Sequence, residues 1–455
     1  MITPPAIVLT AGQGTRMKSD TPKALHQLCG REMIGVVVDN ATAAGIGPIV
    51  VVIAPNTDSI KDSLDGSARY AVQDEPLGTG HAVLQARGML PMDGHVMLLN
   101  GDVPLVKQET FKAILQRHAE KEAVLTVLTS TLTEPAGLGR VVRGNDGSVQ
   151  EIVEERAFSD LSGASTEINA GVYFVQSRWL WDTLPKLEPS ETGEIYLTDL
   201  VTAAAEQGLI VESVQVSDGA EAFGVNNRIE LARAEAVLRQ RIREHWMLEG
   251  VSMPDPSSVY IDYTAKIGQD TVILPNTHIT GRTAIGPRCK IGPNSIVSDS
   301  TLGSDCEVQA SVIEDAVLED RVDVGPFSHL RSGSYLERDV HIGNYSEVKN
   351  SRLGIGTKSG HFSYLGDAEI GANVNIGAGS ITCNFDGEQK SRTIIGDDVF
   401  IGCDTMMVAP LTIGARSYTG TGSVINKDVP PDSGAIGAPA RIIRKKPDPN
   451  TQDSG

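Results

Sequence analysis

Two hydrophobic patterns divide the chain. Over the first 225 residues, short aliphatic runs alternate with longer segments that mix polar and apolar positions, which is typical of strands alternating with helices. After Pro254 the pattern changes, and an aliphatic residue followed by glycine recurs at spacings that include 6 and 18 residues. A chain of 455 residues also exceeds what one hydrophobic core usually supports. The sequence therefore predicts two domains of different construction.

The first half predicts an α/β doubly wound, Rossmann-like domain. Aliphatic runs indicate five strands, at residues 6–9, 49–53, 96–99, 124–128 and 172–175. Helical patterns lie between them, at residues 34–43, 80–87 and 110–121. Such alternation implies right-handed crossovers and a mainly parallel sheet, whose ligands bind at the carboxyl ends of the strands.

The second half, about residues 259–436, predicts a parallel β-helix of six-residue repeats. Pairs such as Ile267-Gly268, Ile285-Gly286 and Ile291-Gly292 place an aliphatic residue inside and a glycine at the corner. Three such faces make one triangular turn of about 18 residues. Solenoids of this kind commonly associate through their flat sides, so an oligomer is expected.

Three further segments complete the expected organisation. An amphipathic helix at 227–250 links a nucleotide-binding domain at 1–226 to a β-helix domain at 251–446. The six-residue period breaks between Ser380 and Thr393, which predicts an inserted loop of the kind that often forms a binding face. The polar tail at 447–455 is expected to be disordered.

Charge and cysteine content narrow the classes of function. The 39 basic and 58 acidic residues give a net charge of -19, which disfavours nucleic acid and anionic membranes as broad partners. The five cysteines include no CxxC pair, so neither a disulfide framework nor a zinc site is indicated, and a reducing cytosol is expected. No basic region precedes an apolar run at the start, and no apolar stretch approaches the roughly 20 residues of a membrane span. We therefore expect neither targeting nor membrane insertion.

A phosphate-binding loop follows the first predicted strand. The segment GQGTRM at 12–17 offers glycines for close backbone approach and Arg16 as a forked cation. It lacks the third glycine of a dinucleotide fingerprint and the GKS/T of a Walker A loop, which disfavours hydride transfer and P-loop hydrolysis. With PKAL at 22–25 it forms the pattern GxGTRM…PKxL, which resembles the sugar-1-phosphate nucleotidyltransferase family.

The rest of the first half resembles the same family in order. QDEPLGTGH at 73–81 is similar to its nucleobase-contacting segment, NGDVP at 100–104 to its metal-binding segment, and GVNN at 224–227 to its closing segment. The resemblance implies that Arg16 and Lys23 stabilise pyrophosphate and that Asp102 and Asn226 bind Mg²⁺. The residues implied to hold the nucleotide and the sugar are Leu9, Thr10, Ala11, Gly12, Lys23, Gln73, Gly78, Thr79, Asn100, Gly101, Asp102, Gly139, Glu154, Asn169 and Asn226.

Polar segments of the second half extend the resemblance to nearly the whole chain. SHLR at 328–331, EVK at 347–349, GHFSYLGDAEIG at 360–371, NVNIGAG at 373–379 and TCNFDG at 382–387 occur in order. Together with the first half they resemble the bifunctional N-acetylglucosamine-1-phosphate uridyltransferase / glucosamine-1-phosphate acetyltransferase family of bacteria. This resemblance implies a left-handed β-helix and a homotrimer with acetyl sites shared between neighbours. It also implies a cytoplasmic enzyme that uses UTP and acetyl-CoA to make UDP-N-acetylglucosamine for cell-envelope and peptidoglycan synthesis.

The resemblance places an acetyl-transfer site on the β-helix. His361 would be the general base, a role that imidazole suits because it exchanges protons near neutral pH. Arg331 and Lys349 would hold the sugar phosphate. Tyr364, Asn375 and Asn384 would complete the substrate pocket. Acetyl-CoA would contact Ala378, Asn384, Phe385, Cys403, Thr421 and Arg441.

Three residues depart from the family pattern. Asn100 and Phe385 stand where tyrosine is frequent, and Cys403 stands where serine is frequent, so a hydroxyl is missing at each position. The segment GAPAR at 437–441 resembles the end of other hexapeptide acyltransferases more than that of the bifunctional enzyme. No motif supplies a base for Cys403, so direct attack by the substrate amine is preferred to a covalent intermediate.

Two alternatives stay open at this point. One is a single-activity nucleotidyltransferase, similar to glucose-1-phosphate adenylyltransferase, whose β-helix only assembles or regulates the oligomer. The other is a non-catalytic assembly subunit with decayed sites. A purely structural β-helix would not need the full set of polar residues found there, which are His361, Asn384, Lys349 and Arg331. A non-catalytic subunit would not need the intact GxGTRM pattern with Lys23.

Overall fold

A computed structural model of the chain describes residues 3–12, 14–132, 138–154, 165–191 and 193–444. Its contacts divide the chain into two units, residues 1–238 and 239–455. The division falls within α7 (Arg228–Leu248), the helix that the sequence predicts as a linker. The tail expected to be disordered, 447–455, lies outside the described residues.

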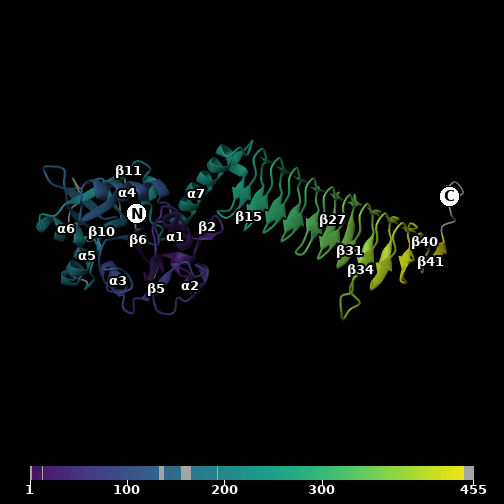
Figure 1. The fold of residues 1–455 in the computed structure, drawn as a ribbon, viewed down its shortest axis with the longest axis horizontal. Coiled ribbons are helices and arrows are strands. Elements are labelled where there is room, and N and C mark those ends of the chain that lie inside the picture. Colours follow the sequence, from purple (N-terminus) through teal and green to yellow (C-terminus); the bar gives the residue numbers. More distant parts are fainter. Residues whose placement is uncertain (1–2, 13, 133–137, 155–164, 192, 445–455) are drawn as a thin grey trace, which may run out of the picture. The chain divides into compact units, whose positions relative to one another are not determined.

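The first unit is built on a sheet with the strand order β11-β7-β10-β6-β1-β4-β5 (Figure 1). A hairpin of β8 and β9 joins it through β10. All five strands predicted from the sequence are present in this sheet. Its strands are β1 (Ala6–Leu9), β4 (Ile49–Ile53), β5 (Arg69–Val72), β6 (His95–Asn100), β7 (Leu125–Thr131), β8 (Arg140–Arg143), β9 (Val149–Val153), β10 (Glu167–Gln176) and β11 (Val211–Val216).

Within the path from β11 to β5, one strand departs from the parallel arrangement. β1 pairs in parallel with β4 and β6, and β11 pairs in parallel with β7. β10 instead runs antiparallel to both β6 and β7. No helix is described between β7 and β10, and parallel pairing needs a crossover that is usually a helix. Apart from the β8–β9 hairpin, the predicted sheet is therefore confirmed as mainly parallel, with one reversed strand, β10, near its middle.

Helices bury both faces of this sheet. Ile7 of β1 packs with residues of α3, α5 and α6, whereas its neighbours Ala6 and Val8 pack with residues of α1 and α4. This split follows from the alternation of side chains along a strand. The helices are α1 (Met33–Ala43), α2 (Ser59–Ser63), α3 (Thr79–Gln85), α4 (Gln108–Glu120), α5 (Ser177–Thr183) and α6 (Asp199–Glu206).

The second unit is a parallel β-helix, as the six-residue repeat predicts, and it is left-handed, as the family resemblance implies. Successive coils give one short strand to each of three sheets. Figure 1 shows the coils stacked one after another from β15 (His278–Thr280) to β40 (Ser433–Ile436). We call these sheets side 1, from β12 (Tyr260–Ile261) to β39 (Val424–Ile425), side 2, from β13 (Lys266–Ile267) to β37 (Leu411–Ile413), and side 3, from β14 (Val272–Ile273) to β41 (Arg441–Arg444).

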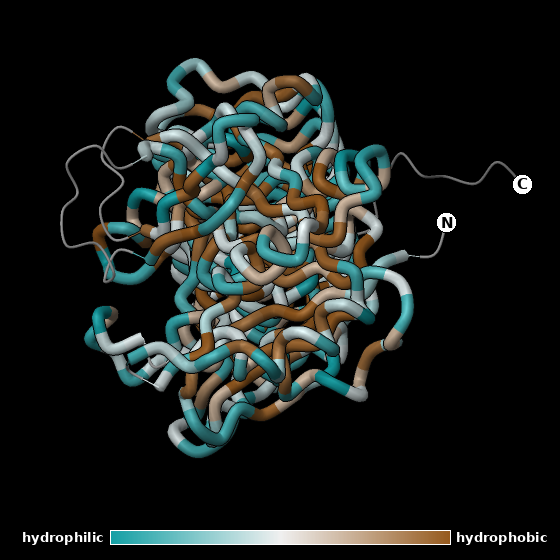
Figure 2. The backbone as a smooth tube through the Cα atoms, turned by 90° about the vertical axis from the view of Figure 1, so that its left-hand side faces the viewer, coloured by the Kyte–Doolittle hydropathy of each residue, from teal (hydrophilic) through white to brown (hydrophobic). Residues whose placement is uncertain are grey.

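Stacked aliphatic residues fill the interior of the coils. On side 2, Ile267, Ile285 and Leu302 occupy register positions one above another and are all buried. In the first unit, which faces the viewer in Figure 2, hydrophobic segments of the backbone tube likewise gather inside and hydrophilic ones occupy the outer loops. At one corner, a Cβ on Gly343 would collide with the Gly360 carbonyl of the next coil, which explains why glycine follows the aliphatic residue there.

One loop interrupts the coils, between β33 (Ile381–Cys383) and β34 (Thr393–Ile395), and it projects beside β34 in Figure 1. The break in the six-residue period predicts this insertion, and the prediction is confirmed. Among the residues that the structure describes, no helix has both the length and the apolar character that a membrane crossing requires.

Two candidate active sites

The phosphate-binding loop and the aspartate segment lie side by side at one edge of the first sheet. β1 ends at Leu9 and β6 at Asn100, and these two residues are register partners in parallel strands. The Gly101 N–H then donates to the Leu9 carbonyl at 2.9 Å. Residues 10–12 and 101–102 therefore leave the sheet together, at the carboxyl ends of their strands, where such sheets bind ligands.

Every residue that the sequence assigns to nucleotidyl transfer lines one of two adjoining hollows at this edge. The first hollow, of about 490 Å³, contains Leu9, Thr10, Ala11, Gly12, Lys23, Gln73, Gly78, Thr79, Asn100, Gly101 and Asp102. The second, of about 880 Å³, adds Arg16, Gly139, Glu154, Asn169 and Asn226. Gly12, Lys23, Thr79, Asn100 and Asp102 line both hollows. The two hollows thus form one continuous cleft, which we call the nucleotidyl cleft.

Gln73 and Gly78 fix the segment expected to contact the nucleobase. Gln73 is 5% exposed, and its side-chain amide donates to the Gly78 carbonyl at 3.1 Å. Gly78 has a φ of 96°, and a Cβ there would collide with the backbone of Ile195. Only glycine fits this close approach. The wall of the first hollow is therefore set by backbone packing before any ligand binds.

Four polar side chains meet where the two hollows join. Lys23 Nζ lies 2.5 Å from Asp102 Oδ2 and 3.2 Å from Asn226 Oδ1, and Arg16 Nη2 lies 3.0 Å from the same Asn226 oxygen. The backbone holds this group together, because the Val225 N–H donates to the Asp102 carbonyl at 2.8 Å. Two cationic side chains and two oxygen donors therefore share one point of the cleft.

The oxygens of Asp102 and Asn226 fit a magnesium ion. Both already converge on a single cationic nitrogen, that of Lys23. Mg²⁺ prefers oxygen donors, keeps several waters and is usually bound through one or two carboxylates together with substrate phosphates. Across the described part of the chain, no cluster of three or more His, Cys, Asp or Glu side chains could hold a metal alone. A magnesium site here would therefore need oxygens from the substrate.

Asn169 and Glu154 form the far wall of the second hollow. The Asn169 N–H donates to the Gly139 carbonyl at 3.0 Å, and its side-chain amide donates to the Tyr173 hydroxyl at 2.6 Å. Glu154 Oε1 accepts from the Thr198 hydroxyl at 3.1 Å. Burial, and then the charge of Glu154, raises the pKa of Tyr173, so this phenol remains a neutral hydrogen-bonding group. The wall is thus rigid and rich in polar groups that suit a sugar.

Glu194 and Tyr196 line both hollows, and the sequence did not single them out. The Tyr196 hydroxyl donates to Glu194 Oε2 at 2.5 Å. Their segment is held against the cleft by Ile195, whose carbonyl accepts from the Gly80 N–H at 2.8 Å. The segment belongs to no helix or strand and carries no hydrophobic period, so its sequence gave no signal of this position.

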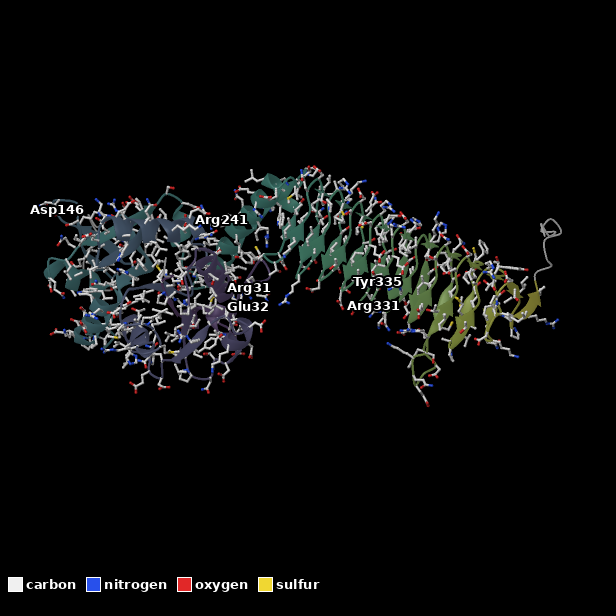
Figure 3. The ribbon with its side chains drawn as sticks, viewed as in Figure 1. Arg31, Glu32, Asp146, Arg241, Arg331 and Tyr335 are labelled. Carbon is white, nitrogen blue, oxygen red and sulfur yellow. The ribbon has the colours of Figure 1, made fainter. Side chains whose placement is uncertain are left out.

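On the β-helix, Arg331, Lys349 and Tyr364 come together on side 1. Glu347 is the register partner of Tyr364, and Lys349 that of Gly366. Arg331 Nη1 donates to Glu347 Oε1 at 2.8 Å, and Figure 3 shows Arg331 among the side chains outside the coils. The strands concerned are β24 (His329–Leu330), β27 (Ser346–Lys349) and β30 (Ser363–Gly366). Two cations and a phenol therefore share one exposed face.

Four of the predicted acetyl-transfer residues occupy one corner of the β-helix. His361, Ala378, Cys403 and Thr421 each lie two residues beyond a register position of side 3, at the corner leading into side 1. Backbone hydrogen bonds connect these corners from coil to coil. The Asp404 N–H donates to the Ala378 carbonyl at 2.7 Å, and the Gly422 N–H donates to the Cys403 carbonyl at 2.9 Å. We call this line of residues the corner row. At about 4.8 Å per coil it is about 14 Å long.

His361 and Cys403 are both open to solvent in this row. Both side chains are exposed, and the carbonyl of His361 accepts from the Ser346 hydroxyl at 2.8 Å, which fixes the backbone. Within the described ranges, no hydrogen bond occupies the His361 imidazole. Asn375 lies beside the row on side 3, in β32 (Asn375–Ile376). A ligand that runs along the row from Thr421 toward His361 would meet small side chains between them.

Asn384 and Phe385 lie at the opposite edge of side 1. β33 separates the corner row from Asn384, a distance of about 13 Å at 3.3 Å per residue. Phe385 is 58% exposed at the start of the inserted loop. Arg441 is exposed in β41, paired with Ile436 of β40 (Ser433–Ile436). A single chain therefore brings the corner row together but leaves Asn384 on another edge.

Two family models match the chain. The nucleotidyl transferase model matches residues 5–220, which span the first sheet and its cleft. The bacterial transferase hexapeptide model, of six repeats, matches residues 264–299 within the β-helix. Fold and sites together define a nucleotidyltransferase joined to a hexapeptide-repeat transferase.

Curated bacterial relatives match nearly the full length. Bifunctional protein GlmU of Geotalea uraniireducens is 45% identical over 445 residues, which cover 97% of each chain. The protein of the same name from Geobacter metallireducens is 43% identical over 453 residues, 95% of each chain. That of Halalkalibacterium halodurans is 43% identical over 443 residues, 97% of each chain. The chain belongs to the GlmU family of bifunctional proteins.

Proposed function

We propose that the chain makes UDP-N-acetylglucosamine in two steps, acetyl transfer to glucosamine-1-phosphate and then uridylyl transfer from UTP to N-acetylglucosamine-1-phosphate. Both activities belong to the family of which the chain is a member. One observation carries the proposal: a single chain holds both the nucleotidyl cleft and the corner row headed by His361. A single-activity nucleotidyltransferase would not require the residues of the corner row.

In uridylyl transfer, a phosphate oxygen of the sugar attacks the α-phosphorus of UTP, and pyrophosphate leaves. Such a reaction depends on positioning and charge neutralisation rather than on a protein nucleophile. Arg16 and Lys23 lie in one cluster and would stabilise the leaving pyrophosphate. Asp102 and Asn226 would hold Mg²⁺, which when bound neutralises phosphate charge. Lys23 is bonded to both in the structure and would then be freed to face the phosphates.

The sugar phosphate would lie in the second hollow. Gly139, Glu154 and Asn169 would hold the sugar there, while Leu9 to Gly12, Gln73, Gly78 and Thr79 would hold the nucleotide in the first hollow. Asn100, the register partner of Leu9, and Gly101 line the first hollow directly before Asp102 and would face the ribose and α-phosphate. The continuity of the two hollows supports an in-line arrangement of the reacting groups.

In acetyl transfer, the amine of glucosamine-1-phosphate attacks the thioester carbonyl, and coenzyme A leaves as its thiol. His361 would take the proton from the attacking amine. Arg331 and Lys349 would bind the sugar phosphate as two cations on one face, with Tyr364 and Asn375 beside them. Because an unprotonated amine is itself a good nucleophile, no covalent acetyl intermediate on Cys403 is needed.

Acetyl-CoA would lie along the corner row. Ala378, Cys403 and Thr421 have small side chains on successive coils beyond His361, so an extended chain could follow them with its thioester at the His361 end. Asn384 and Phe385 would contact it from the inserted loop, and Arg441 would pair with its phosphates. Asn384 stands on another edge of side 1, which supports a homotrimer in which neighbouring copies complete each site. We further propose a cytoplasmic enzyme that supplies cell-envelope synthesis.

The proposal is tested by following both products in one preparation. With acetyl-CoA, glucosamine-1-phosphate, UTP and Mg²⁺, we expect UDP-N-acetylglucosamine to form. Chelation of the metal should abolish pyrophosphate release and leave N-acetylglucosamine-1-phosphate to accumulate, because only the nucleotidyl cleft offers metal ligands in the proposal. Pyrophosphate release from N-acetylglucosamine-1-phosphate without any acetyl transfer would instead favour a single-activity enzyme with a structural β-helix.

Alkylation of Cys403 offers a separate test of the acetyl-CoA path. This thiol is exposed, whereas Cys29, Cys289 and Cys306 are buried. N-ethylmaleimide adds a bulky group in the middle of the corner row, so it should lower acetyl transfer by at least about 10-fold and leave uridylyl transfer unchanged. Excess acetyl-CoA should protect the activity. The variant Cys403→Ser, with Cys383 still present, serves as the resistant control, and loss of its activity on alkylation would argue against this path.

A further inference from the structure

Asp367 joins three coils at the corner where side 1 meets side 2. Its Oδ1 accepts a hydrogen bond from Asn350 Nδ2 at 2.6 Å, and its Oδ2 accepts one from Asn384 Nδ2 at 2.5 Å. Asn350 belongs to the preceding coil and Asn384 to the following one, 17 residues away on either side. The residue has a φ of 49°, a conformation that Asp and Asn tolerate better than most residues.

The backbone of Asp367 also holds the inserted loop. Its N–H donates to the Lys349 carbonyl at 3.0 Å, and its carbonyl accepts from the Thr393 N–H at 3.2 Å. Thr393 is the residue at which the coil resumes after the insertion, and Asn384 is the residue at which the insertion begins. The Ser391 N–H closes the loop by donating to the Asn384 carbonyl at 2.8 Å. Asp367 therefore clamps both ends of the loop.

The carboxylate dictates how the Asn384 amide is turned. Burial works to raise the pKa of Asp367, but hydrogen bonds from Asn350 and Asn384 and the charges of Lys390 and Lys349 outweigh it and lower that pKa. An ionised carboxylate only accepts hydrogen bonds, so it must face the Nδ2 of Asn384. Asn384 is 8% exposed, and no hydrogen bond within the described ranges occupies its Oδ1. The amide thus keeps an acceptor oxygen free.

Other acidic residues at the same corner position do not do this. Asp315 has a φ of 44° and accepts from the Ser332 hydroxyl at 2.5 Å. Asp299 has a φ of 47° and accepts from the Arg282 N–H at 2.9 Å. Ser332 lies on the coil after Asp315, Arg282 lies on the coil before Asp299, and neither partner belongs to a proposed site. A structural role in the corner therefore accounts for Asp299 and Asp315, but not for the contact of Asp367 with Asn384.

We infer that Asp367 is a positioning residue for acetyl transfer, which fixes Asn384 so that its Oδ1 accepts a hydrogen bond from the acceptor sugar. The inference rests on the proposed acetyl transfer. An acceptor oxygen pairs with an N–H or O–H of glucosamine-1-phosphate, whereas the thioester carbonyl has no hydrogen to donate. Held in this way, the amine would present its lone pair to the thioester while His361 takes the proton. The Oδ1 of Asn384 can therefore pair with the sugar but not with the thioester carbonyl, and any contact of Asn384 with acetyl-CoA lies elsewhere on that molecule.

The test is a double-mutant cycle in the full-length chain. Asp367→Asn keeps the shape of the side chain, but its amide can donate to Asn384 Oδ1 and turn the Asn384 amide around. We expect kcat for acetyl transfer to fall by about 100-fold, as for a small misplacement of a reacting group, with KM for acetyl-CoA within about two-fold. The double variant, with both Asp367→Asn and Asn384→Ala, should have the same kcat as the single variant Asn384→Ala, because the two residues act as one unit.

Asp315→Asn is the matched control, because it changes an aspartate at the equivalent corner without touching Asn384. Its acetyl transfer should stay within about two-fold of the unmodified chain. Uridylyl transfer and the melting temperature report folding in all variants. If Asp367→Asn does not fold, Asp367→Gly, which tolerates the same φ, is expected to show the same loss.

Two results would overturn the inference while leaving the proposed function intact. One is full acetyl transfer by Asp367→Asn when Asn384→Ala is inactive. The other is a double variant whose loss is the product of the two single losses. Full activity of Asn384→Ala, or no acetyl transfer by the unmodified chain, would instead remove the proposed role of Asn384 and the inference with it.

Discussion

Replacing His361 by alanine is expected to lower acetyl transfer by about 10²- to 10⁴-fold, the range usual for the loss of a general base. The side chain is exposed at the head of the corner row, so its removal leaves the core of the β-helix untouched. Uridylyl transfer should remain at the level of the unmodified chain. Chromatographic separation of N-acetylglucosamine-1-phosphate and UDP-N-acetylglucosamine measures both activities in one reaction series.

His278→Ala provides the matched control on the same side of the β-helix. His278 lies in β15 (His278–Thr280), stacked on Tyr260 with ring centroids 4.5 Å apart, several coils before the corner row begins. Its loss removes an imidazole from side 1 without reaching the proposed site, so both activities should persist. An active His361→Ala variant would assign the base to another residue, and an inactive His278→Ala variant would trace the loss to the β-helix as a whole.

The elements that the sequence predicts well are those set by local pattern. Residues 6–9 and 49–53 are predicted as strands and form β1 and β4 with those bounds, because an uninterrupted aliphatic run can be buried on both faces of a parallel sheet. The β-helix is predictable for the same reason. Each coil repeats one short pattern, and its contacts reach only the neighbouring coils.

The features that escape prediction depend on contacts between distant parts of the chain. β10 runs antiparallel to β6 and β7, a direction set by how the chain returns to the sheet, which no hydrophobic period of the strand itself reveals. Glu194 and Tyr196 reach the nucleotidyl cleft only because Ile195 packs on Gly78, more than 100 residues earlier in the sequence. Neighbouring residues along the chain gave no sign of that contact.

Asp367 illustrates the same limit within the β-helix. It belongs to the segment GHFSYLGDAEIG that carries the resemblance, yet the sequence alone assigns it no role. Its contact with Asn384 needs the coil to close and the insertion to begin directly above it. Residue types at single positions can thus suggest chemistry, but the orientation of a side chain comes only from its partners.

Replacing Asp102 by alanine is expected to abolish uridylyl transfer, with a loss of at least about 10³-fold, because one substitution removes two electrostatic contributions. Asp102 would supply the only carboxylate ligand of Mg²⁺ in the proposed site, and it holds Lys23 at 2.5 Å. Asp93→Ala is the matched control in the same unit, since Asp93 forms an exposed ion pair with Arg178 at 2.6 Å.

Acetyl transfer by the Asp102→Ala chain decides between two models. If the two sites are separate, N-acetylglucosamine-1-phosphate should accumulate at the rate of the unmodified chain while no pyrophosphate is released, the reverse of the His361→Ala result. Raising the Mg²⁺ concentration should not restore activity, because Asn226 alone leaves too few protein oxygens for the ion. Loss of both activities in both variants, with melting temperatures unchanged, would contradict two independent sites and require a single site shared by both reactions.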